Sequence, residues 1–142
     1  MKKTISSALA LTMAVLMLVS LVACSKPTDT DLIWKDALYT SDTELGEGAK
    51  TVKVEVKAGE KSVIFTIKTD KAVLGDALIE HGLIEGDQGQ YGLYIKKVNG
   101  ITADYDVDKH YWGFYKNGEY MMTGVDGTEF ADNDSYELVY SE

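Results

Sequence analysis

The chain has 142 residues, with 14 basic and 23 acidic side chains and a net charge of −9. This length is typical of one small domain. A single cysteine excludes an internal disulfide framework, a cysteine-ligated iron–sulfur cluster and a Cys₄ zinc site. The acidic balance and the absence of arginine argue against a nucleic-acid partner, because clustered Lys and Arg carry the affinity for phosphates. With two histidines and no GxSxG motif, no nucleophile–base pair stands out, and we expect that the protein is not an enzyme.

The N-terminal residues carry the pattern of a bacterial export signal. Lys2 and Lys3 form a positive start, and the stretch 5–23 is mostly apolar and has no charge. Its length leaves a membrane-spanning helix or an ordinary secretory signal open. The four residues LVAC at its end resemble a lipobox, which implies cleavage before Cys24 and acylation of this cysteine. The position of the only thiol favours this interpretation.

A lipobox implies an exported protein that a lipid anchors to the outer face of the bacterial cytoplasmic membrane, or to the outer membrane if the host has one. Two or more acyl chains anchor far better than one, because each buried CH₂ contributes about 0.8 kcal/mol. Without residues 1–23 the chain has 12 lysines against 23 acids and a net charge of −11. This charge repels anionic lipid headgroups, so the expected membrane contact is made through the acyl chains.

Residues 25–48 contain the only proline, many Thr, Asp and Ser, and few apolar residues. This composition predicts a flexible tether. Within it, the cluster Leu32-Ile33-Trp34 either docks on the domain or forms a short helix. We therefore expect three parts, listed in chain order: a signal peptide at residues 1–23, an acylated tether at 24–48 and a folded domain at 49–142.

The predicted domain opens with a hairpin and one helix. Apolar residues alternate with polar ones in 51–57 and 62–68, which predicts two half-buried strands joined by a tight turn. The period then changes to that of a helix, which Thr69 or Asp70 could N-cap, with Gly82 as the residue after its end. Four residues lie at helical spacing: Leu74, Ala77, Leu78 and His81.

Several strands follow the helix. A glycine-rich segment at 86–90 predicts a loop, and the strands expected after it are 92–98, 111–115, 119–122 and 136–140. Asn117-Gly118 predicts a type I′ hairpin turn, because both positions of that turn need a positive φ. Two strands, one helix and then several strands indicate an α+β fold, with a β-grasp-like mixed sheet packed on one helix.

Aromatic residues concentrate in one part of the chain. Eight of the 14 aromatics lie within 30 residues: Tyr91, Tyr94, Tyr105, Tyr111, Trp112, Phe114, Tyr115 and Tyr120. Strand alternation places Trp112 and Phe114 on one face and Tyr111 and Tyr115 on the other. One small core cannot bury all of these rings, so we expect an exposed aromatic binding edge. The alternative is that tyrosine is simply a good strand residue with its hydroxyl at the surface.

Other polar residues give weaker signals. Asp104, Asp106 and Asp108 alternate as in a calcium loop, but the glycine and glutamate that an EF-hand requires are missing, and we expect no metal site. His81 is expected to cap the helix C-terminus, where a partly charged imidazole is favourable. His110 is expected to be a surface residue at the start of a strand.

From Val63 onward the sequence resembles the bacterial DUF4430 domain, which is similar to the C-terminal β-domain of transcobalamin and intrinsic factor. The matching segments, covering about 80 residues, are VLGDAL at 73–78, YGLYI at 91–95, VNGI at 98–101, YWGFY at 111–115, NGEY at 117–120, TGV at 123–125 and YELVY at 136–140. The resemblance implies a β-grasp-like ligand-binding module. In the vertebrate carriers such a domain closes over one side of a corrinoid that a helical domain holds, and residues 25–48 are too short and polar to form such a partner.

The resemblance implies a set of ligand-facing residues: Tyr91, Tyr94, Trp112, Phe114, Tyr115, Met121, Met122, Thr123 and Gly124. Asn117 and backbone amides are expected to orient polar groups of the ligand. If Trp112 lies on the open face, its replacement by alanine should abolish binding and leave most of the fold intact.

Three hypotheses for function follow. The first is a surface lipoprotein that captures a small molecule, with a corrinoid of the cobalamin type as the transported ligand rather than a cofactor, and passes it to a transporter or a second surface protein. The second is a protein–protein interaction module at the cell surface. An enzyme ranks last.

Overall fold

The computed structural model describes residues 28–142. The predicted signal peptide, residues 1–23, and the predicted acylation site, Cys24, lie outside the described residues. Within the described part, no helix is long and apolar enough to cross a membrane.

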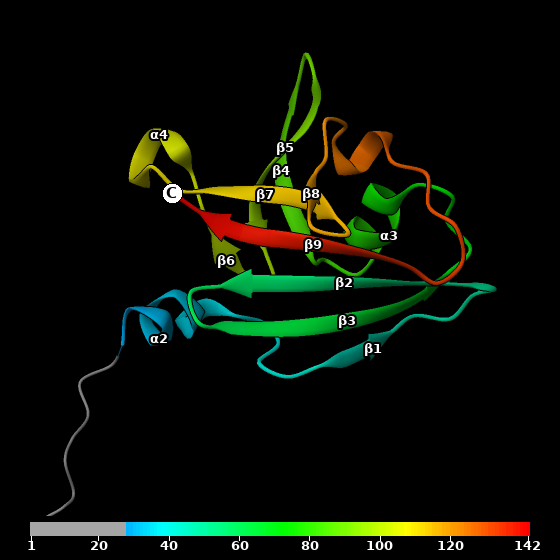
Figure 1. Cartoon of the computed structure of the whole chain (residues 1–142), viewed down its shortest axis with the longest axis horizontal. Helices are drawn as coiled ribbons and strands as arrows, with labels where there is room; N and C mark the ends of the chain where they lie inside the picture. The colour runs from blue at the N-terminus through cyan, green and yellow to red at the C-terminus, as the bar shows by residue number, and fades with distance from the viewer. Residues whose placement is uncertain (1–27) are drawn as a thin grey trace, which may run out of the picture.

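A mixed six-stranded sheet forms the main layer, with the strand order β1-β3-β2-β9-β7-β8 (Figure 1). Its strands are β1 (Thr43–Leu45), β2 (Lys50–Ala58), β3 (Lys61–Thr69), β7 (Tyr111–Lys116), β8 (Glu119–Tyr120) and β9 (Asp134–Ser141). The central pair, β2 and β9, is parallel, and so is the pair β1 and β3. The remaining neighbours are antiparallel. The central parallel pair joins the first hairpin of the sheet to its last strand.

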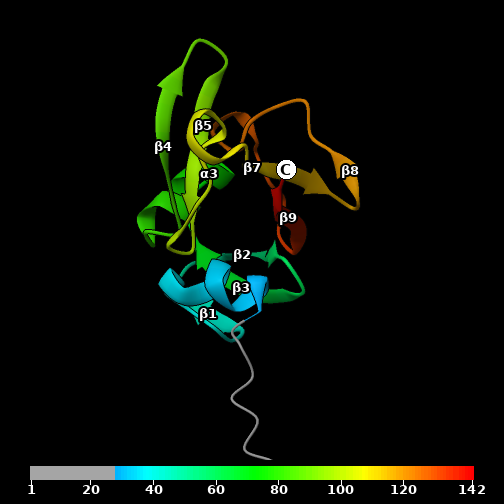
Figure 2. The same cartoon turned by 90° about the vertical axis from the view of Figure 1, so that its left-hand side faces the viewer.

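A second layer covers one face of this sheet. It consists of helix α3 (Leu74–Glu80) and a three-stranded antiparallel sheet of β4 (Ile84–Gly89), β5 (Gly92–Val98) and β6 (Ile101–Thr102). The short elements are α2 (Asp29–Ile33), η1 (Trp34–Asp36), α4 (Tyr105–Asp108) and η2 (Val125–Gly127). In Figure 2 the large sheet curls, and β4, β5 and α3 stand across from β9. The prediction of an α+β fold with a mixed sheet is confirmed.

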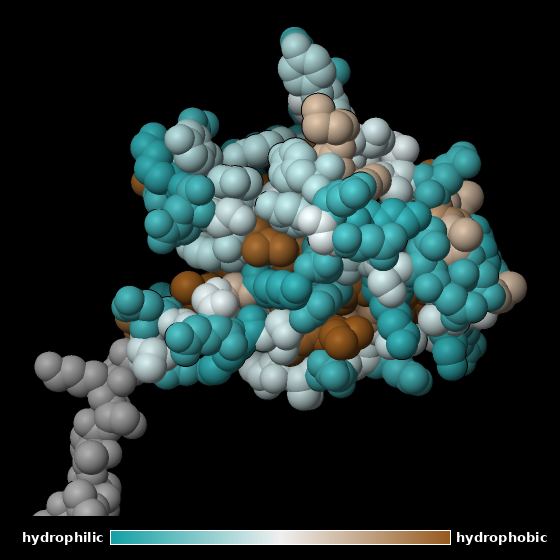
Figure 3. All heavy atoms as spheres, viewed as in Figure 1, coloured by the Kyte–Doolittle hydropathy of each residue, from teal (hydrophilic) through white to brown (hydrophobic). Residues whose placement is uncertain are grey.

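Alternation along the strands decides which face of the large sheet is buried. Val52, Val54 and Val56 are buried on β2, as are Val63 and Phe65 on β3. The predicted hairpin is thus confirmed, with each strand extended by one residue at either end. The outer face of the sheet is mostly hydrophilic (Figure 3). There the Lys57 ammonium lies 2.6 Å from a carboxylate oxygen of Glu137 and 3.6 Å from one of Glu55.

Helix α3 forms where predicted, but Val73 and not Thr69 or Asp70 is its N-cap. The two polar side chains stabilise the preceding turn instead: the Thr69 hydroxyl accepts from the backbone N–H of Lys71, and the Asp70 carboxylate accepts from that of Ala49. The first helical N–H, of Leu74, donates to the carbonyl of Thr128 at 2.8 Å. A backbone partner from another segment thus replaces the side-chain cap.

The C-terminal end of α3 is as predicted. His81 is the C-cap residue, and Gly82 follows with φ +65°. This left-handed conformation favours glycine, which has no Cβ to clash.

The glycine-rich segment 86–90 was expected to be a loop, and this prediction is wrong. Residues up to Gly89 belong to β4 and pair with β5, with a register shift between Glu85 and Gly86. A Cβ on Gly86 would collide with the carbonyl oxygen of Tyr94. Glycine is required here because two strands approach each other closely, and not because the chain turns. Composition alone does not distinguish these two uses of glycine.

The expected tether is part of the fold from residue 28 onward, so the predicted boundary at residue 49 lies too late in the chain. Trp34 is 6% exposed, and its indole Nε1 donates to the carbonyl of Ala58 at 2.8 Å. Strand β1 extends the sheet by pairing with β3. The side-chain amide of Asn99 donates to the carbonyl of Tyr39 and accepts from its N–H, at 2.8 and 2.9 Å. Of the two alternatives left open for the apolar cluster at 32–34, both occur: a short helix forms, and Trp34 docks.

We predict that Trp34→Ala lowers the free energy of unfolding by about 3–5 kcal/mol, because it removes a buried aromatic side chain and leaves the Ala58 carbonyl without its donor. Urea denaturation followed by circular dichroism measures this change. Leu32→Ala on the same segment is the matched control, since Leu32 is half exposed, and should change the stability by about 0.5 kcal/mol or less. Equal, small effects of the two substitutions would show that this segment does not stabilise the domain.

Candidate functional site: an open aromatic cleft

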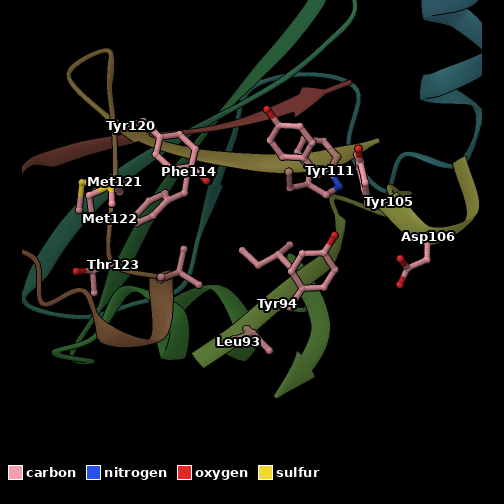
Figure 4. A pocket seen from close by; sticks show the side chains of 14 residues that line it. Leu93, Tyr94, Tyr105, Asp106, Tyr111, Phe114, Tyr120, Met121, Met122 and Thr123 are labelled. Carbon is pink, nitrogen blue, oxygen red and sulfur yellow. The ribbon is translucent and has the colours of Figure 1, made fainter. Parts of the chain in front are cut away.

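A cleft of about 650 Å³ lies between the two layers, above strand β7. Four parts of the chain frame it: β5, α4, β7 and the segment from β8 to η2 (Figure 4). Its lining residues are Leu93, Tyr94, Ile95, Tyr105, Asp106, Tyr111, Trp112, Phe114, Tyr120, Met121, Met122, Thr123, Gly124 and Val125. We call this site the aromatic cleft.

Trp112 and Phe114 of β7 form the floor of the aromatic cleft, and each is 7% exposed. Strand β9 supports both rings. Trp112 meets Tyr140 edge to face, and Phe114 stacks on Tyr136, each pair with ring centroids 5.5 Å apart. The Trp112 indole Nε1 donates to the carbonyl of Ile101 at 3.3 Å. The floor is therefore a set of rings whose orientation is fixed by packing against neighbouring rings on the same face of the sheet.

The surroundings of Tyr136 and Tyr140, the two tyrosines that pack against the floor, keep both of them neutral. Burial, followed by the Asp134 carboxylate, raises the pKa of Tyr136, and burial raises that of Tyr140. The Asp134 carboxylate accepts from the Tyr136 hydroxyl, the Lys116 ammonium and the backbone N–H of Ala131. The bond from Ala131 is the main cause of a lowered pKa of Asp134. Both tyrosines are thus neutral at neutral pH, and the Tyr136 hydroxyl is in addition held by its hydrogen bond to Asp134.

Strand β5 forms one wall, and Asp126 positions it. The Asp126 carboxylate accepts from the backbone N–H of Leu93 at 3.0 Å and so ties the β4–β5 hairpin to η2. Gly92 has φ +105°, and a Cβ there would lie 2.8 Å from Asp126 Oδ1. The close contact between these two segments therefore requires glycine at position 92. Tyr94 extends from this wall and is 43% exposed.

The opposite wall is the β7–β8 hairpin and the segment after it. Its turn residues Asn117 and Gly118 have φ +51° and +78°, so the predicted type I′ geometry is supported by the signs of both angles. Strand β8 is shorter than predicted and ends at Tyr120. The backbone N–H of Met121 still donates to the carbonyl of Phe114 at 2.9 Å, which keeps this wall next to the floor.

Helix α4 closes one end of the cleft with Tyr105 and Asp106. Asp104 is its N-cap, and its side chain accepts from the backbone N–H of Asp106. The Lys96 ammonium of β5 lies 2.8 Å from the Asp87 carboxylate and 3.4 Å from that of Asp104, and these two partners, Asp87 foremost, raise the pKa of Lys96. Asp104 of the acidic triplet thus caps the start of α4, and its ion pair with Lys96 connects this helix to β5. Among residues 28–142 no three His, Cys, Asp or Glu side chains gather as metal ligands would.

His110 lies next to the cleft without lining it. It is half-buried and stacks on Tyr140 with the ring centroids 4.7 Å apart. Its two ring nitrogens each lie 3.6 Å from a carboxylate oxygen, of Asp108 and Glu142 respectively. This histidine therefore packs against the tyrosine that lies beside Trp112 on the neighbouring strand.

Seven of the residues expected to face a ligand line the aromatic cleft: Tyr94, Trp112, Phe114, Met121, Met122, Thr123 and Gly124. Three lie elsewhere. Tyr91, at the tip of the β4–β5 hairpin, is 91% exposed. Tyr115 packs over Gly113 on the other face of β7, with its ring edge-to-face on Tyr120. Asn117 lies in the hairpin turn, beside a small hollow on the outer face of the sheet.

The other seven lining residues were not among the expected ligand-facing ones: Leu93, Ile95, Tyr105, Asp106, Tyr111, Tyr120 and Val125. Three of them are tyrosines from the aromatic-rich segment. Tyr111 shares the strand face of Tyr115 yet reaches the end of the cleft, so strand alternation alone misplaces it. The density of aromatics was the signal that could have found these tyrosines.

The fold and the site define a small α+β domain with an open cleft lined by aromatic side chains. The chain belongs to the DUF4430 family, a domain of unknown function, whose sequence model matches residues 71–142. The predicted family is thereby confirmed. No curated protein matches the chain at a significant level.

Two solved structures are similar to this chain. A protein from Ruminococcus gnavus ATCC 29149, described as a candidate metal-binding protein, is 36% identical with a TM-score of 0.63, over 66% of this chain and 98% of its own. Haptocorrin in complex with Cbi is 18% identical with a TM-score of 0.53. That match covers 66% of this chain but 25% of the haptocorrin chain, so it shows a shared fold for about a quarter of that protein.

We predict that Trp112→Ala lowers the free energy of unfolding by about 3–5 kcal/mol, because the ring is buried against Tyr140. This replaces the expectation that the substitution spares the fold. Urea denaturation of the ligand-free protein measures the loss, and Tyr94→Ala at the exposed edge of the cleft is the control, with a cost of about 1 kcal/mol or less. A Trp112→Ala protein as stable as the parent would place this ring outside the core.

Proposed function

We propose that the protein is a lipid-anchored binding protein outside the cytoplasm that holds a flat, largely apolar small molecule in the aromatic cleft. The observation that carries this proposal is the floor of the cleft: Trp112 and Phe114 pack side by side with Tyr140 and Tyr136 of β9, and both line an open cavity. Rigid rings facing an open cleft offer stacking and van der Waals contact at a small entropic cost. Binding, and not catalysis, is the function that such a lining favours.

We propose a corrinoid of the cobalamin type as the ligand. The similarity in fold to haptocorrin, a corrinoid-binding protein, supports this choice. The chemistry of the lining supports it as well, because a corrinoid presents a broad, flat ring system with amide groups at its edge. Hydroxyls at the rim, those of Tyr94, Tyr120 and Thr123, suit such amides.

The cleft would cover only part of a corrinoid. At about 650 Å³ it has the size of a site for a drug-sized molecule, and it is open on one side. We therefore propose that a transporter or a second surface protein receives the ligand from this side. The lipid on Cys24, after removal of residues 1–23, would keep the domain at the membrane where that transfer takes place.

A second candidate function is the binding of a partner protein. Three exposed apolar side chains stand on elements that frame the cleft: Tyr91 on the β4–β5 hairpin, Val107 on α4 and Met122 after β8. Exposed apolar groups that flank a concave site are typical of protein contacts. The same cleft mouth would then contact a protein without a small molecule.

We predict that the full chain, in a mild nonionic detergent, binds cobinamide and that Tyr94→Ala weakens this binding about tenfold or more, the effect of removing an aromatic contact at a binding site. Isothermal titration calorimetry, with a detergent blank, measures the dissociation constant. Tyr91→Ala is the matched control: it removes the same side chain from the same hairpin, but outside the cleft, and should leave the affinity within about twofold.

Two outcomes would contradict the proposal. If Tyr91→Ala weakens cobinamide binding as much as Tyr94→Ala does, the ligand lies along the hairpin tip and not in the cleft. If the parent chain shows no heat change with cobinamide at high micromolar concentration, the ligand is not a corrinoid and the partner-protein function gains support.

We further predict that Cys24→Ala blocks lipidation in the bacterial host. The substituted precursor should keep residues 1–23 and lack the diacylglycerol group, because no thiol remains to form the thioether. Metabolic labelling with a radioactive fatty acid, followed by mass spectrometry of the N-terminus, measures both effects. Ser25→Ala is the neighbouring control and should still be labelled. A Cys24→Ala protein that is processed to a soluble mature form would contradict the lipoprotein proposal.

A further inference from the structure

We infer that the aromatic cleft selects its ligand by charge: it binds flat molecules that carry a positive charge better than neutral ones, and rejects anions, with Asp106 as the residue that sets this preference. This inference rests on the proposed function, because it concerns the ligand of the same cleft. It adds the electrical character of that ligand and a specificity-determining residue.

The lining of the cleft is rich in groups that attract cations. Six of the lining residues are aromatic: Tyr94, Tyr105, Tyr111, Trp112, Phe114 and Tyr120. The face of an aromatic ring carries a negative partial charge, so a cation over several such faces is attracted and an anion is repelled. One ring already shows this interaction, since the Lys109 ammonium lies 5.0 Å from the centroid of the Tyr105 ring.

One carboxylate of the acidic triplet Asp104, Asp106 and Asp108 is left available for a ligand. Asp104 caps α4 and pairs with Lys96, and Asp108 accepts from the backbone N–H groups of Asp104 and His110. Asp106 is the member whose carboxylate has no hydrogen bond or ion pair within the described residues 28–142, and it lines the cleft (Figure 4). Its charge is therefore uncompensated at the end of an aromatic site.

Among residues 28–142, no lysine side chain lines the cleft to balance the negative charge of Asp106. None of the fourteen lining residues is a lysine. Lysines on or next to the framing elements are engaged: Lys96 with Asp87 and Asp104, Lys97 with Glu85, Lys116 with Asp134, and Lys109 with the ring of Tyr105. The chain as a whole carries a net charge of −9, which also lowers the local concentration of anions at a cleft.

Three acridines of one shape test the inference on the full chain in a nonionic detergent. At mildly alkaline pH, 10-methylacridinium is a cation, acridine is neutral and acridine-9-carboxylate is an anion, and all three share one flat frame. Dissociation constants come from calorimetry with a detergent blank. We expect the cation to bind about three- to tenfold more tightly than the neutral compound, the range of one partly screened charge pair, and the anion to bind more weakly than both.

The variant Asp106→Asn keeps the shape of the side chain and removes its charge. It should weaken binding of 10-methylacridinium about three- to tenfold and leave binding of acridine unchanged. Glu47→Gln is the matched control, because it removes the same charge from an exposed residue of the β1–β2 connection, far along the chain from the lining residues. It should leave the affinities of all three compounds unchanged.

Each result separates this inference from the proposed function on which it rests. If cation and anion bind with equal affinity, and Tyr94→Ala weakens both, the cleft is a small-molecule site without charge selection and only the present inference falls. If Asp106→Asn and Glu47→Gln weaken the cation equally, the net charge and not Asp106 sets the preference. If none of the three acridines binds, the charge inference is overturned, and the result with cobinamide then decides separately on the proposed function.

Discussion

The packing of β7 on β9 is the interaction on which the site depends. Trp112 lies directly opposite Tyr140 in the antiparallel register, and Phe114 lies diagonally from Tyr136, with its ring stacked on it. The rings of β9 thus fill the space that would otherwise let the floor of the cleft collapse or rotate. The bond between Asp126 and Leu93 ties the β4–β5 hairpin to η2, and the rings of Trp112 and Phe114 line the open cavity between this hairpin and β7.

Much of the fold follows from local pattern, and the exceptions have physical causes. The alternation of valines in β2 and the pair Asn117-Gly118 determine structure within a few residues, so the sequence predicts them well. Trp34 is different, because its buried indole is hydrogen-bonded to the carbonyl of Ala58, 24 residues away. Because residues 28–48 are mostly polar, their composition did not indicate that they form an N-terminal part of the domain. The same holds for the start of α3, where the carbonyl of Thr128 takes the place of a side-chain cap.

The part of the candidate site that lies on the single strand β7 was predictable from the sequence. Alternation correctly grouped Trp112 with Phe114, but it could not tell that their shared face is both packed from β9 and open to a cleft. Tyr91 and Tyr94 lie three residues apart with equal aromatic character, and only the hairpin geometry separates a ring at the exposed tip from one in the wall. Asp106 stands out in the sequence as part of an acidic triplet, yet the proposal for it depends on the partners of Asp104 and Asp108, which the sequence does not show. Long-range contacts decide these cases, and a sequence pattern does not contain them.

The proposed function requires that a flat molecule rests on the rings of β7. The chain offers an internal reference for testing it, because it has two tryptophans, Trp112 in the floor of the cleft and Trp34 in the N-terminal segment. The most direct measurement is the proton–nitrogen NMR spectrum of the two indole groups during titration of the ¹⁵N-labelled chain with cobinamide. The account predicts a saturable shift of the Trp112 indole resonance, from the ring system placed above it, and an unchanged Trp34 resonance. A titration in which the Trp112 resonance stays in place, or in which Trp34 shifts instead, would contradict it.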